Sequence, residues 1–509
     1  ARGIIRKNLR AYESGGLLLM EKIRVRFAPS PTGPLHIGGA RSALFNYLFA
    51  RQNHGDFILR MEDTDLERSS KESEEDIKNA LKWLGITWNE GIDVGGPHSP
   101  YRQTERLDIY RKAVDRLLQK GFAYYCYCSE EECEAERQEL MAKGETPRYL
   151  GKCRQLTEEE KKQFEKEGRK PVIRFRVPEN CIVKIDDLVR GEVTFETGEM
   201  GDFIIVKSDG IPTYNFAVVI DDAEMGITHV LRGEEHLSNT PRQMLIYDAL
   251  GLKKPKFAHI SLILGKDRSK MSKRHGSTSV VAYKGQGYLP EAIVNFLALL
   301  GWAPPGEEEI FSLEELAEKF SLERVSKSPA VFDMEKLKWI NGYYIRNMPN
   351  EHLKEMAVPY LKEAGFLKEN SIEEDRLIDL VIDTLKNYLS CLADIKEKIG
   401  LFTGTTVTFE SEKAKNILSE EHVPLVVTKF VQKIQTSEEL NPEHIKAILK
   451  SIRKETKLGG SQVFMPIRVA LTGQMHGPDL DKLAAILGKD MILARLTDSA
   501  QKAGFTLNP

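Results

Sequence analysis

Hydrophobic and polar residues alternate near the start of the chain, and this alternation predicts a strand. Ile23, Val25 and Phe27 are separated by two arginines, which is the period of a half-buried strand. The pattern then predicts, in order, a helix over 38–52, a strand over 57–61 and helices over 73–84 and 101–120. This β-α-β-α order indicates a parallel sheet covered by helices.

The pattern changes between residues 124 and 200, where we expect an inserted α+β domain. Several cysteines cluster at the start of this region, a highly charged helix is predicted over 157–168, and short strands come after it. Strand-like apolar runs at 203–206, 218–220 and 229–231 then indicate that the first sheet resumes, with a turn at 208–212.

After about residue 350 the strand signals nearly vanish. Apolar residues recur at helical spacing, as in Leu377, Leu380, Val381 and Leu385 and again in Ile445, Ile448, Leu449 and Ile452. Short connections bearing glycine and proline separate such stretches to the end of the chain. We therefore expect an all-helical domain of roughly 150 residues, which is an ordinary domain size.

Composition supports a multidomain globular protein. The chain has 509 residues, of which 41% are hydrophobic and 29% are charged, and a length above ~300 residues predicts several cores. The net charge of −3 means that any nucleic-acid binding rests on local basic surfaces. There is no apolar run of ~20 residues, so no membrane span is expected. Six cysteines do not make a disulfide framework, which favours a reducing, cytoplasmic location.

The first nineteen residues are basic, irregular and unlike the rest of the chain. Met20 precedes the first predicted strand and has the character of a natural start. Glu13 to Gly16 is the peptide that a ribosome-binding sequence would encode shortly before the Met20 codon. We therefore interpret residues 1–19 as a non-native or artefactual extension; a targeting peptide is the alternative, although the stretch is short and poor in serine.

Two segments far apart in the chain together indicate nucleotide chemistry. The first, 29–39, combines a turn rich in glycine and proline with His36 and a helix start, where backbone N–H groups favour an anion. The second, 267–274, is a loop that carries Lys270, Lys273 and Arg274. Alone, these are an ordinary loop histidine and a solvated charge run. Together they predict a site that holds a nucleoside triphosphate and stabilises charge on its phosphates.

Four further polar residues lie at predicted strand ends or in the adjoining loops. Arg26 and Arg232 are suited to grip a carboxylate, Glu62 could pair with an ammonium group, and Tyr214 lies nearby. Because ligands bind outside the carboxyl ends of parallel strands, these side chains are candidates for a substrate pocket. Taken singly, each charged residue is more often part of a surface ion pair.

The cysteines of the inserted region suggest a metal site. Cys126, Cys128 and Cys153 with Tyr149 would supply three thiolates and a phenolate, which is a closed four-ligand zinc site. The bland alternative is a set of ordinary thiols, since Cys-x-Cys is a weak signal. Cys133 is expected on a helix outside the set, and Cys181 and Cys391 in cores.

With these motifs the chain resembles the bacterial-type glutamyl-tRNA synthetases, which are class I aminoacyl-tRNA synthetases. The resemblance covers 20–509 and rests on the signature at 29–39 and the loop at 270–274, with supporting motifs at 60–65, 100–106, 210–214 and 232–236. Two positions depart from the signatures: Gly39 stands where the first has His, and Arg274 where the second has Ser.

The resemblance implies an α/β Rossmann-like class I synthetase core with an inserted α+β domain, followed by an all-α anticodon-binding domain. It divides the chain, after residues 1–19, into the first half of a Rossmann catalytic domain (20–125), an inserted acceptor-binding domain (126–202), the second half of the catalytic domain (203–265), a Lys-Met-Ser-Lys-Ser-like loop with a stem-contact domain (266–349) and a helical anticodon-binding domain (350–509).

The activity implied is ATP-dependent attachment of L-glutamate to tRNA(Glu) through glutamyl-adenylate, with release of AMP and diphosphate; some family members also charge tRNA(Gln) with glutamate. His36, Lys270 and Lys273 would be catalytic. ATP would contact Pro29, Ser30, Pro31, Thr32, Gly33, His36, Gly38, Gly39, Lys270, Met271, Ser272, Lys273 and Arg274. Glutamate would contact Arg26, Ala28, Ser30, Glu62, Tyr214 and Arg232.

The resemblance also implies Mg²⁺ with ATP, a structural zinc on Cys126, Cys128, Tyr149 and Cys153, and a monomer. Some relatives have a His two residues after the third cysteine, where this chain has Gln155; others use a tyrosine four residues before it, as at Tyr149.

Four alternative functions stay open on the sequence alone. Glutaminyl-tRNA synthetases share the core, but their anticodon part is a β-barrel, and Arg232 suits a carboxylate better than an amide. A short tRNA-modifying relative lacks the helical domain. A small-molecule adenylyltransferase and a non-enzymatic tRNA-binding regulator are the remaining alternatives; the long helical tail argues against the first, and His36 with Lys270 and Lys273 against the second.

Overall fold

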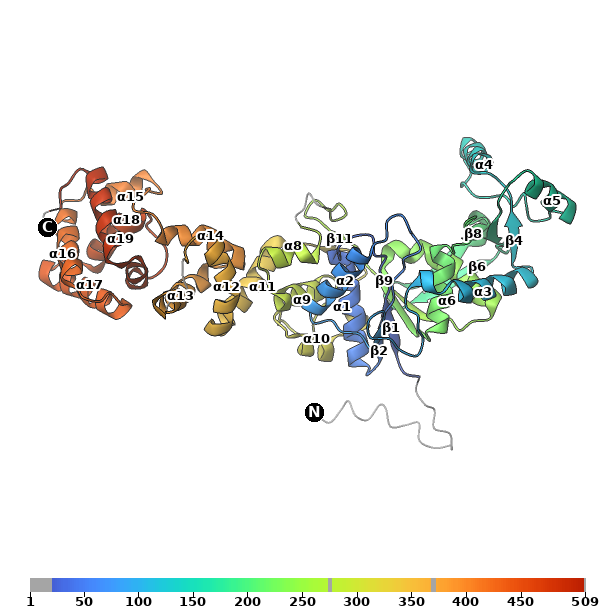
Figure 1. Ribbon diagram of the computed structural model, residues 1–509, viewed down its shortest axis with the longest axis horizontal. Coiled ribbons are helices and arrows are strands. Elements are labelled where there is room, and N and C mark those ends of the chain that lie inside the picture. The colour runs from blue at the N-terminus through green and yellow to red at the C-terminus, as the bar shows by residue number, and fades with distance from the viewer. Residues whose placement is uncertain (1–20, 273–276, 368–371, 508–509) are drawn as a thin grey trace, which may run out of the picture. The chain divides into compact units, whose positions relative to one another are not determined.

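The computed structural model describes residues 21–272, 277–367 and 372–507 (Figure 1). The chain divides into two compact units. The first comprises the residues up to Val281 together with Val294–Phe332, and the second comprises Ala282–Ile293 and the residues from Asp333 onward. Among the described helices, none combines the length and apolar character needed to cross a bilayer.

The first unit is built on parallel strands, as the alternation pattern predicted. Strands β1 (Arg24–Phe27), β2 (Asp56–Leu59) and β3 (Glu90–Gly91) form one parallel sheet in the order β1-β2-β3, with Arg26 opposite Ile58. Helices α1 (Ile37–Gln52), α2 (Lys71–Trp83) and α3 (Leu107–Gln119) come between or after them. The predicted helix over 101–120 therefore begins at Leu107, after the 3₁₀ turn η1 (Gln103–Glu105).

A second sheet continues the first. Its order is β7 (Gly191–Glu196), β6 (Ile182–Asp187), β10 (Lys256–Ile260) and β9 (His229–Gly233), parallel except for β7. The amide of Thr228 donates to the carbonyl of Arg24 at 2.9 Å, so β9 lies beside β1. The carboxyl ends of β1, β2, β9 and β10 therefore face the same side. Strands β6 and β7 fall inside the range expected for the inserted domain, yet they pair within this catalytic sheet.

A smaller antiparallel sheet combines one strand of the inserted range 126–202 with a strand at each edge of that range. It has the order β4 (Ala123–Cys126), β5 (Val172–Phe175) and β8 (Phe203–Val206). Two charged helices accompany it, α4 (Glu130–Ala142) and α5 (Glu158–Lys166), and Figure 1 shows them grouped with β4. Both helices begin with a reciprocal capping box, Ser129 with Glu132 and Thr157 with Glu160, which explains why such polar sequences start where they do.

Several sequence-based expectations are wrong. Residues 203–206 form a strand, but this strand, β8, pairs with β5 in the smaller sheet and does not resume the first sheet. Residues 218–220 belong to helix α6 (Tyr214–Glu224), not to a strand. The residues from Phe216 to Asp222 are all buried, and an apolar run that is buried all round has the same pattern as a buried strand. Cys181 is exposed rather than in a core, and Cys391 is only partly buried.

Several further elements belong to the first unit. They are η2 (Thr197–Glu199), η3 (Glu234–Asn239), α7 (Thr240–Leu250), β11 (Ile263–Leu264), α10 (Leu313–Lys319), η5 (Leu322–Arg324) and β12 (Ala330–Val331). Strands β11 and β12 pair in parallel. Helices α8 (Val280–Gly285) and α9 (Pro290–Leu299) cross the division between the units.

The second unit is helical, as predicted. Its elements are α11 (Met334–Asn347), α12 (Asn350–Glu363), α13 (Ile372–Leu385), η6 (Lys386–Tyr388), η7 (Leu392–Asp394), α14 (Ile395–Lys398), η8 (Ile399–Phe402), α15 (Glu412–Ile417), α16 (Val423–Thr436), α17 (Pro442–Thr456), α18 (Gly460–Thr472) and α19 (Leu480–Ala503). Ile445, Ile448, Leu449 and Ile452 are all buried on α17, which confirms the spacing argument. Beyond Val331, the described part of the chain contains no strand.

Candidate active site

A cavity of about 650 Å³ opens at the carboxyl ends of β1, β2 and β9. It brings together segments that are far apart in the sequence, as expected for a parallel sheet. Of the predicted site residues, the cavity is lined by Arg26, Ala28, Pro29, Ser30, Thr32, Gly33, His36, Gly38, Gly39, Glu62, Tyr214 and Arg232. The substrate and nucleotide candidates therefore share one cavity.

His36 is held as a hydrogen-bond donor at the start of a helix. It is the N-cap of α1, and its Nδ1 accepts from the amide of Gly38 at 3.1 Å. Burial, and then the charge of Lys270, lowers the pKa of His36 below its usual value. A neutral ring whose Nδ1 accepts must carry its proton on Nε2, so His36 can donate to an anion bound at the helix N-terminus.

The residues that follow the second nucleotide segment lie against the first segment. The carbonyl of Thr278 accepts from the amide of Ile37 at 2.8 Å, and the amide of Val280 donates to Leu35 at 3.0 Å. Lys270 is exposed and close enough to affect the charge of His36. The chain after 276 thus contacts the signature turn, and before 273 the charge of Lys270 reaches His36.

Four predicted ATP-site residues of this loop and turn do not line the cavity. Pro31 is buried, and its carbonyl accepts from the amide of Ser70. Met271 is also buried and donates its amide to Ile263, whereas Lys270 and Ser272 lie next to it in the loop. Lys273 and Arg274 lie outside the described residues.

One side of the cavity, which we call the β1–β2 wall, consists of closely paired charges. Nε of Arg26 donates to both carboxylate oxygens of Asp222, at 3.1 and 3.3 Å. Nη1 of Arg60 donates to the same carboxylate at 2.8 Å, and its Nη2 donates to Glu62 at 3.1 Å. All four side chains are buried, and the two guanidinium groups balance the two carboxylates.

The paired charges set the ionisation of the carboxylates in this wall. Burial opposes the charged form of Asp222, but Arg26 and Arg60 outweigh it and hold the pKa of Asp222 below its usual value. For Glu62 burial prevails over the same two guanidinium groups, and its pKa is raised. A cationic group that entered beside Glu62 would favour the charged carboxylate.

Another side of the cavity, which we call the β9–β10 wall, places an arginine among neutral partners. Arg232 donates through Nε to His259 at 3.2 Å, through Nη2 to Thr240 at 2.8 Å and to Gln243 at 2.9 Å, and through Nη1 to the hydroxyl of Tyr214 at 3.2 Å. In the part of the chain that the structure describes, no carboxylate forms a salt bridge with Arg232. This wall therefore presents a buried positive charge that a carboxylate ligand could neutralise.

The neighbours of this wall include a second histidine. Nδ1 of His236 lies 3.1 Å from the hydroxyl of Tyr214, and both residues line the cavity. Burial, together with the charge of Arg232, lowers the pKa of His236 to about 4. Its ring is therefore neutral near pH 7 and adds no charge beside Arg232.

Sequence reasoning missed most of the groups that orient the predicted residues. Asp222 and His259 lie inside apolar runs and are buried, so no local signal separated them from core positions. His236 and Glu235 belong to the motif at 232–236 without a predicted role, and both line the cavity. A buried ionisable residue in a strand or helix next to a predicted site would have been the usable signal.

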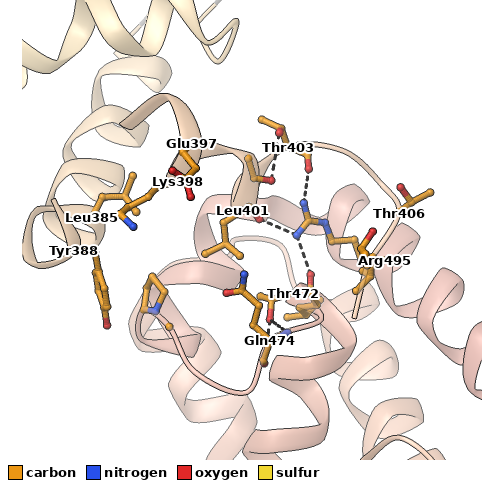
Figure 2. A pocket seen from close by; sticks show the side chains of 16 residues that line it. Leu385, Tyr388, Glu397, Lys398, Leu401, Thr403, Thr406, Thr472, Gln474 and Arg495 are labelled. Atoms are coloured by element: carbon orange, nitrogen blue, oxygen red, sulfur yellow. Dashed lines mark hydrogen bonds between the residues drawn. The ribbon is translucent and has the colours of Figure 1, made fainter. Parts of the chain in front are cut away.

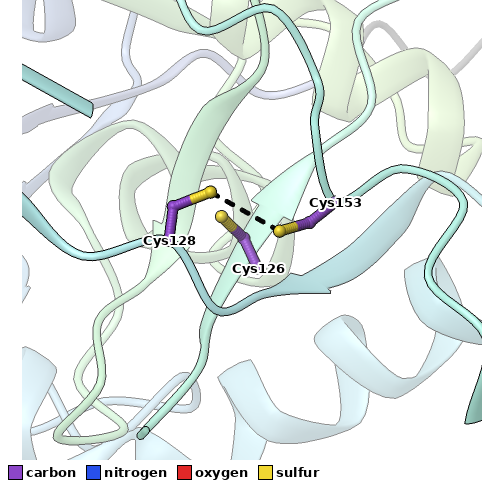
Figure 3. Close-up of side chains that lie close together, drawn as sticks. All are labelled: Cys126, Cys128 and Cys153. Atoms are coloured by element: carbon purple, nitrogen blue, oxygen red, sulfur yellow. Dashed lines mark hydrogen bonds between the residues drawn. The ribbon is translucent and has the colours of Figure 1, made fainter. Parts of the chain in front are cut away.

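The three cysteines of the predicted cluster come together (Figure 3). They are not among the residues that line the cavity. The sulfur atoms of Cys126, Cys128 and Cys153 all lie within 4.8 Å of one another, and the hydroxyl of Tyr149 lies 3.4 Å from Cys126 and from Cys128. Hydrogen bonds from Cys128 and Cys153 hold the pKa of Cys126 below its usual value. These donors fit the chemistry of a thiolate-rich zinc site.

The other cysteines lie outside this group. Cys133 is on α4, as predicted, and its sulfur lies 3.6 Å from Nη2 of Arg174. That guanidinium group also stacks over the ring of Tyr149, with its carbon 3.9 Å from the ring centroid.

The second unit contains a cavity of about 420 Å³ (Figure 2). Arg495 on α19 lies at its edge and is buried. Figure 2 shows its guanidinium group directed at backbone carbonyls, those of Leu401 at 2.8 Å and Thr403 at 2.6 Å, and further bonds reach Gly404 and Leu471. Because all of these partners are main-chain atoms, Arg495 fastens η8 to the end of α18.

Comparison with protein families accounts for most of the chain. Residues 22–339 match the catalytic domain of class I tRNA synthetases (E and Q), and residues 352–500 match an anticodon binding domain. A glutamate–tRNA ligase from Heliobacterium modesticaldum is 64% identical over 489 residues, covering 96% of this chain and 99% of that protein. The glutamate–tRNA ligase of Bacillus subtilis is 52% identical over 478 residues, covering 93% and 99%.

A solved structure agrees with these matches. The crystal structure of a glutamate tRNA ligase from Elizabethkingia meningosepticum, in complex with its amino acid, aligns with a TM-score of 0.85 and 37% identity. The alignment covers 96% of this chain and all of that one.

Proposed function

The chain belongs to the glutamate–tRNA ligase family of class I tRNA synthetases, and from this premise we propose how it works. L-Glutamate and ATP form glutamyl-adenylate with release of diphosphate, and the glutamyl group then passes to the 3′ end of tRNA(Glu) with release of AMP. The observation that carries the proposal is the single cavity lined by the nucleotide turn and by Arg26, Glu62, Tyr214 and Arg232.

The nucleotide side of the cavity stabilises negative charge. The Nε2–H of His36 at the N-terminus of α1 would donate to a phosphate oxygen, and Lys270 and Lys273 would approach the phosphates from the loop. Charge that moves onto the leaving diphosphate is met by these donors, which is where class I chemistry needs stabilisation. Mg²⁺ would accompany ATP and neutralise part of the phosphate charge.

The remaining ATP contacts would come from the backbone and small side chains of the turn and the loop. They are Pro29, Ser30, Pro31, Thr32, Gly33, Gly38, Gly39, Met271, Ser272 and Arg274.

The amino-acid side of the cavity would bind both the side-chain carboxylate and the ammonium group of glutamate. Arg232 supplies an uncompensated guanidinium group for the side-chain carboxylate, with Arg26 beside it. Glu62, at the end of the β1–β2 wall, would face the ammonium group. Tyr214 lies between the two walls, and Ala28 and Ser30 complete the pocket. The α-carboxylate oxygen would then attack the α-phosphorus of ATP.

We assign the rest of the chain to tRNA. The inserted region would meet the acceptor end, residues 266–349 the stem, and the helical domain over 350–509 the anticodon, consistent with the anticodon binding domain matched at 352–500. The protein would act as a cytoplasmic monomer. Charging of tRNA(Gln) with glutamate is a second outcome that the same active site would allow, because the choice of tRNA is made outside the glutamate pocket.

We further propose that Cys126, Cys128, Cys153 and Tyr149 hold a structural zinc ion. Such an ion would tie β4 to the segment before α5 in a small domain that has little core of its own. Metal analysis of the purified protein by mass spectrometry should find about one zinc per chain. Cys153→Ser should lose the metal, whereas Cys181→Ser, at an exposed cysteine, should retain it.

Aminoacylation of purified tRNA(Glu) and tRNA(Gln) with glutamate and with glutamine tests the proposed function. We expect glutamyl-tRNA(Glu), and no aminoacylation with glutamine, because an amide would leave Arg232 without a counter-charge. Glutamyl-tRNA(Gln) as a second product would identify a broader tRNA range. Exchange of diphosphate into ATP without any dependence on glutamate would contradict the proposal.

A further inference from the structure

A continuous line of hydrogen bonds leads from the inserted region of the chain to the glutamate pocket. Asp187, the last residue of β6, lies 2.6 Å through Oδ2 from Nδ1 of His259. Nε2 of the same ring accepts from Nε of Arg232 at 3.2 Å. The line thus joins three neighbouring strands, β6, β10 and β9, which are paired in this order.

The hydrogen-bond partners fix where the protons lie. A carboxylate only accepts, so Nδ1 of His259 carries the proton that is donated to Asp187. Nε2 is then the acceptor in the neutral ring, and the Nε–H of Arg232 can point only at an acceptor. Thr240 is consistent with this arrangement: its hydroxyl accepts from Arg232 at 2.8 Å and lies 3.0 Å from the same Nε2. Each of these side chains is at least nine-tenths buried.

We propose that Asp187 and His259 are positioning residues for Arg232, and that they make the pocket selective for a carboxylate by fixing the Arg232 guanidinium group without neutralising it. This rests on the proposed function, in which Arg232 binds the side-chain carboxylate of glutamate. The single negative charge of the line lies on Asp187, behind the imidazole ring. A carboxylate placed directly on Arg232 would compete with the substrate, whereas a neutral imidazole orients the guanidinium group and leaves its charge for the ligand.

Gln243 and Tyr214 are further uncharged acceptors for the guanidinium group of Arg232. Gln243 accepts from Nη2 at 2.9 Å, and Tyr214 accepts from Nη1 at 3.2 Å. The described partners therefore engage four of the five N–H groups that a guanidinium offers, and all of them are uncharged. Because the plane of the group is fixed at Nε and Nη2, the Nη1 edge stays aimed at the cavity that Arg232 lines.

Asp187 also anchors its own loop, so its variants test two roles at once. Its Oδ1 accepts from the amides of Val189 and Arg190 at 3.0 and 2.8 Å, and Arg190 forms an ion pair with Glu234. His259 is the better residue to substitute, because its ring nitrogens can be replaced one at a time. An asparagine amide reaches the place of Nδ1, and a glutamine amide reaches the place of Nε2.

The test compares three His259 variants in tRNA-dependent ATP–diphosphate exchange. His259→Phe and His259→Asn lack the acceptor for Arg232, and we expect the KM for glutamate to rise about 10- to 100-fold while the KM for ATP changes little. His259→Gln can offer an oxygen at the place of Nε2 and should recover most of the loss. Thr240→Val keeps the shape of the side chain and removes one acceptor for Arg232, so we expect a smaller rise in the KM for glutamate.

His229 is the matched control. It is a second buried histidine, on β9, whose Nδ1 lies 2.9 Å from the hydroxyl of its neighbour Thr228, and His229→Asn should leave both KM values unchanged. Parallel losses for glutamate and ATP in the His259 variants would overturn the proposal, as would His259→Gln behaving like His259→Asn. If no His259 variant folds, an unchanged KM for glutamate in Thr240→Val would also overturn it. An unsubstituted protein that does not use glutamate would instead refute the proposed function.

Discussion

The two walls of the cavity hold arginine in opposite ways. In the β1–β2 wall, Arg26 and Arg60 share the carboxylate of Asp222, and Arg60 also bonds Glu62. In the β9–β10 wall, the partners of Arg232 are a hydroxyl, an amide, a phenol and an imidazole. Burial alone therefore does not distinguish these arginines from one another; the charge of their partners does.

The two arrangements have different consequences for the fold and for ligand binding. A buried ion pair that loses one partner leaves an uncompensated charge, which is costly to the fold. A buried arginine among neutral partners already bears that cost, and a carboxylate ligand relieves it. We therefore expect substitutions in the β1–β2 wall to cost more stability, and substitutions in the β9–β10 wall to reduce the use of glutamate more strongly.

The largest expected effect is that of Arg232→Ala on glutamate. Removal of the guanidinium group takes away a charge-assisted hydrogen bond to the ligand and should lower kcat/KM for glutamate about 1000-fold. The KM for ATP should change by less than about threefold, since the proposed nucleotide contacts lie at the turn and the loop. Steady-state ATP–diphosphate exchange with each substrate varied in turn measures both quantities.

Arg232→Lys is the matched variant, because it keeps the charge and loses the planar fork. It should recover part of the activity of Arg232→Ala. Equal losses for glutamate and ATP in both variants would place Arg232 outside the glutamate site and remove the distinction between the walls.

The second prediction concerns folding. Asp222→Asn removes the carboxylate that Arg26 and Arg60 share, and the free energy of unfolding should fall by about 3 kcal/mol. Urea denaturation followed by circular dichroism measures this loss. Asp248→Asn is the control, since Asp248 pairs with Lys254 at an exposed position and should cost less than about 1 kcal/mol. A loss for Asp222→Asn as small as the control would show that the pairing in this wall is not needed for stability.

The sequence was sufficient for many of the residues that line the cavity, although not for His236 and Glu235, and insufficient for the residues behind them. His36, Arg26, Glu62 and Arg232 were predictable because turns and strand ends have local patterns and because parallel strands end on one side. Asp222 was not predictable, since its role comes from contacts with residues over 160 positions away.

The same limit explains the error at 218–220. This run is apolar and fully enclosed, so its helical period carries no signal, and the tertiary environment alone identifies α6. The register of β6 beside β10 is also a long-range property; residue spacing within 126–202 could not assign that strand to the catalytic sheet.

The third prediction concerns Arg26→Gln, whose effect on the use of glutamate should be smaller than that of Arg232→Ala. It therefore tests the contrast between the two walls. The charge of Arg26 is already matched by Asp222, so its loss should raise the KM for glutamate about tenfold, well below the effect of Arg232→Ala. Asp222 would retain Arg60 as a partner at 2.8 Å, so the loss of stability should also be smaller than in Asp222→Asn. Kinetics and urea denaturation of the two variants side by side give the ranking; an effect of Arg26→Gln on glutamate as large as that of Arg232→Ala would reverse our assignment of the walls.

The smallest effect is expected for Tyr214→Phe. Its hydroxyl accepts from Nη1 of Arg232 at 3.2 Å and lies 3.1 Å from Nδ1 of His236. Phenylalanine keeps the ring and removes this one neutral partner, while three others still orient the guanidinium group, so kcat/KM for glutamate should fall only about fivefold. A loss close to that of Arg232→Ala would mean that the contact of Tyr214 with glutamate outweighs its bond to Arg232, because the orientation of Arg232 does not depend on one hydroxyl. A matched measurement with Tyr283→Phe, at a buried tyrosine of α8 that is not among the residues lining the cavity, separates the loss of a hydroxyl near Arg232 from the loss of a buried hydroxyl elsewhere.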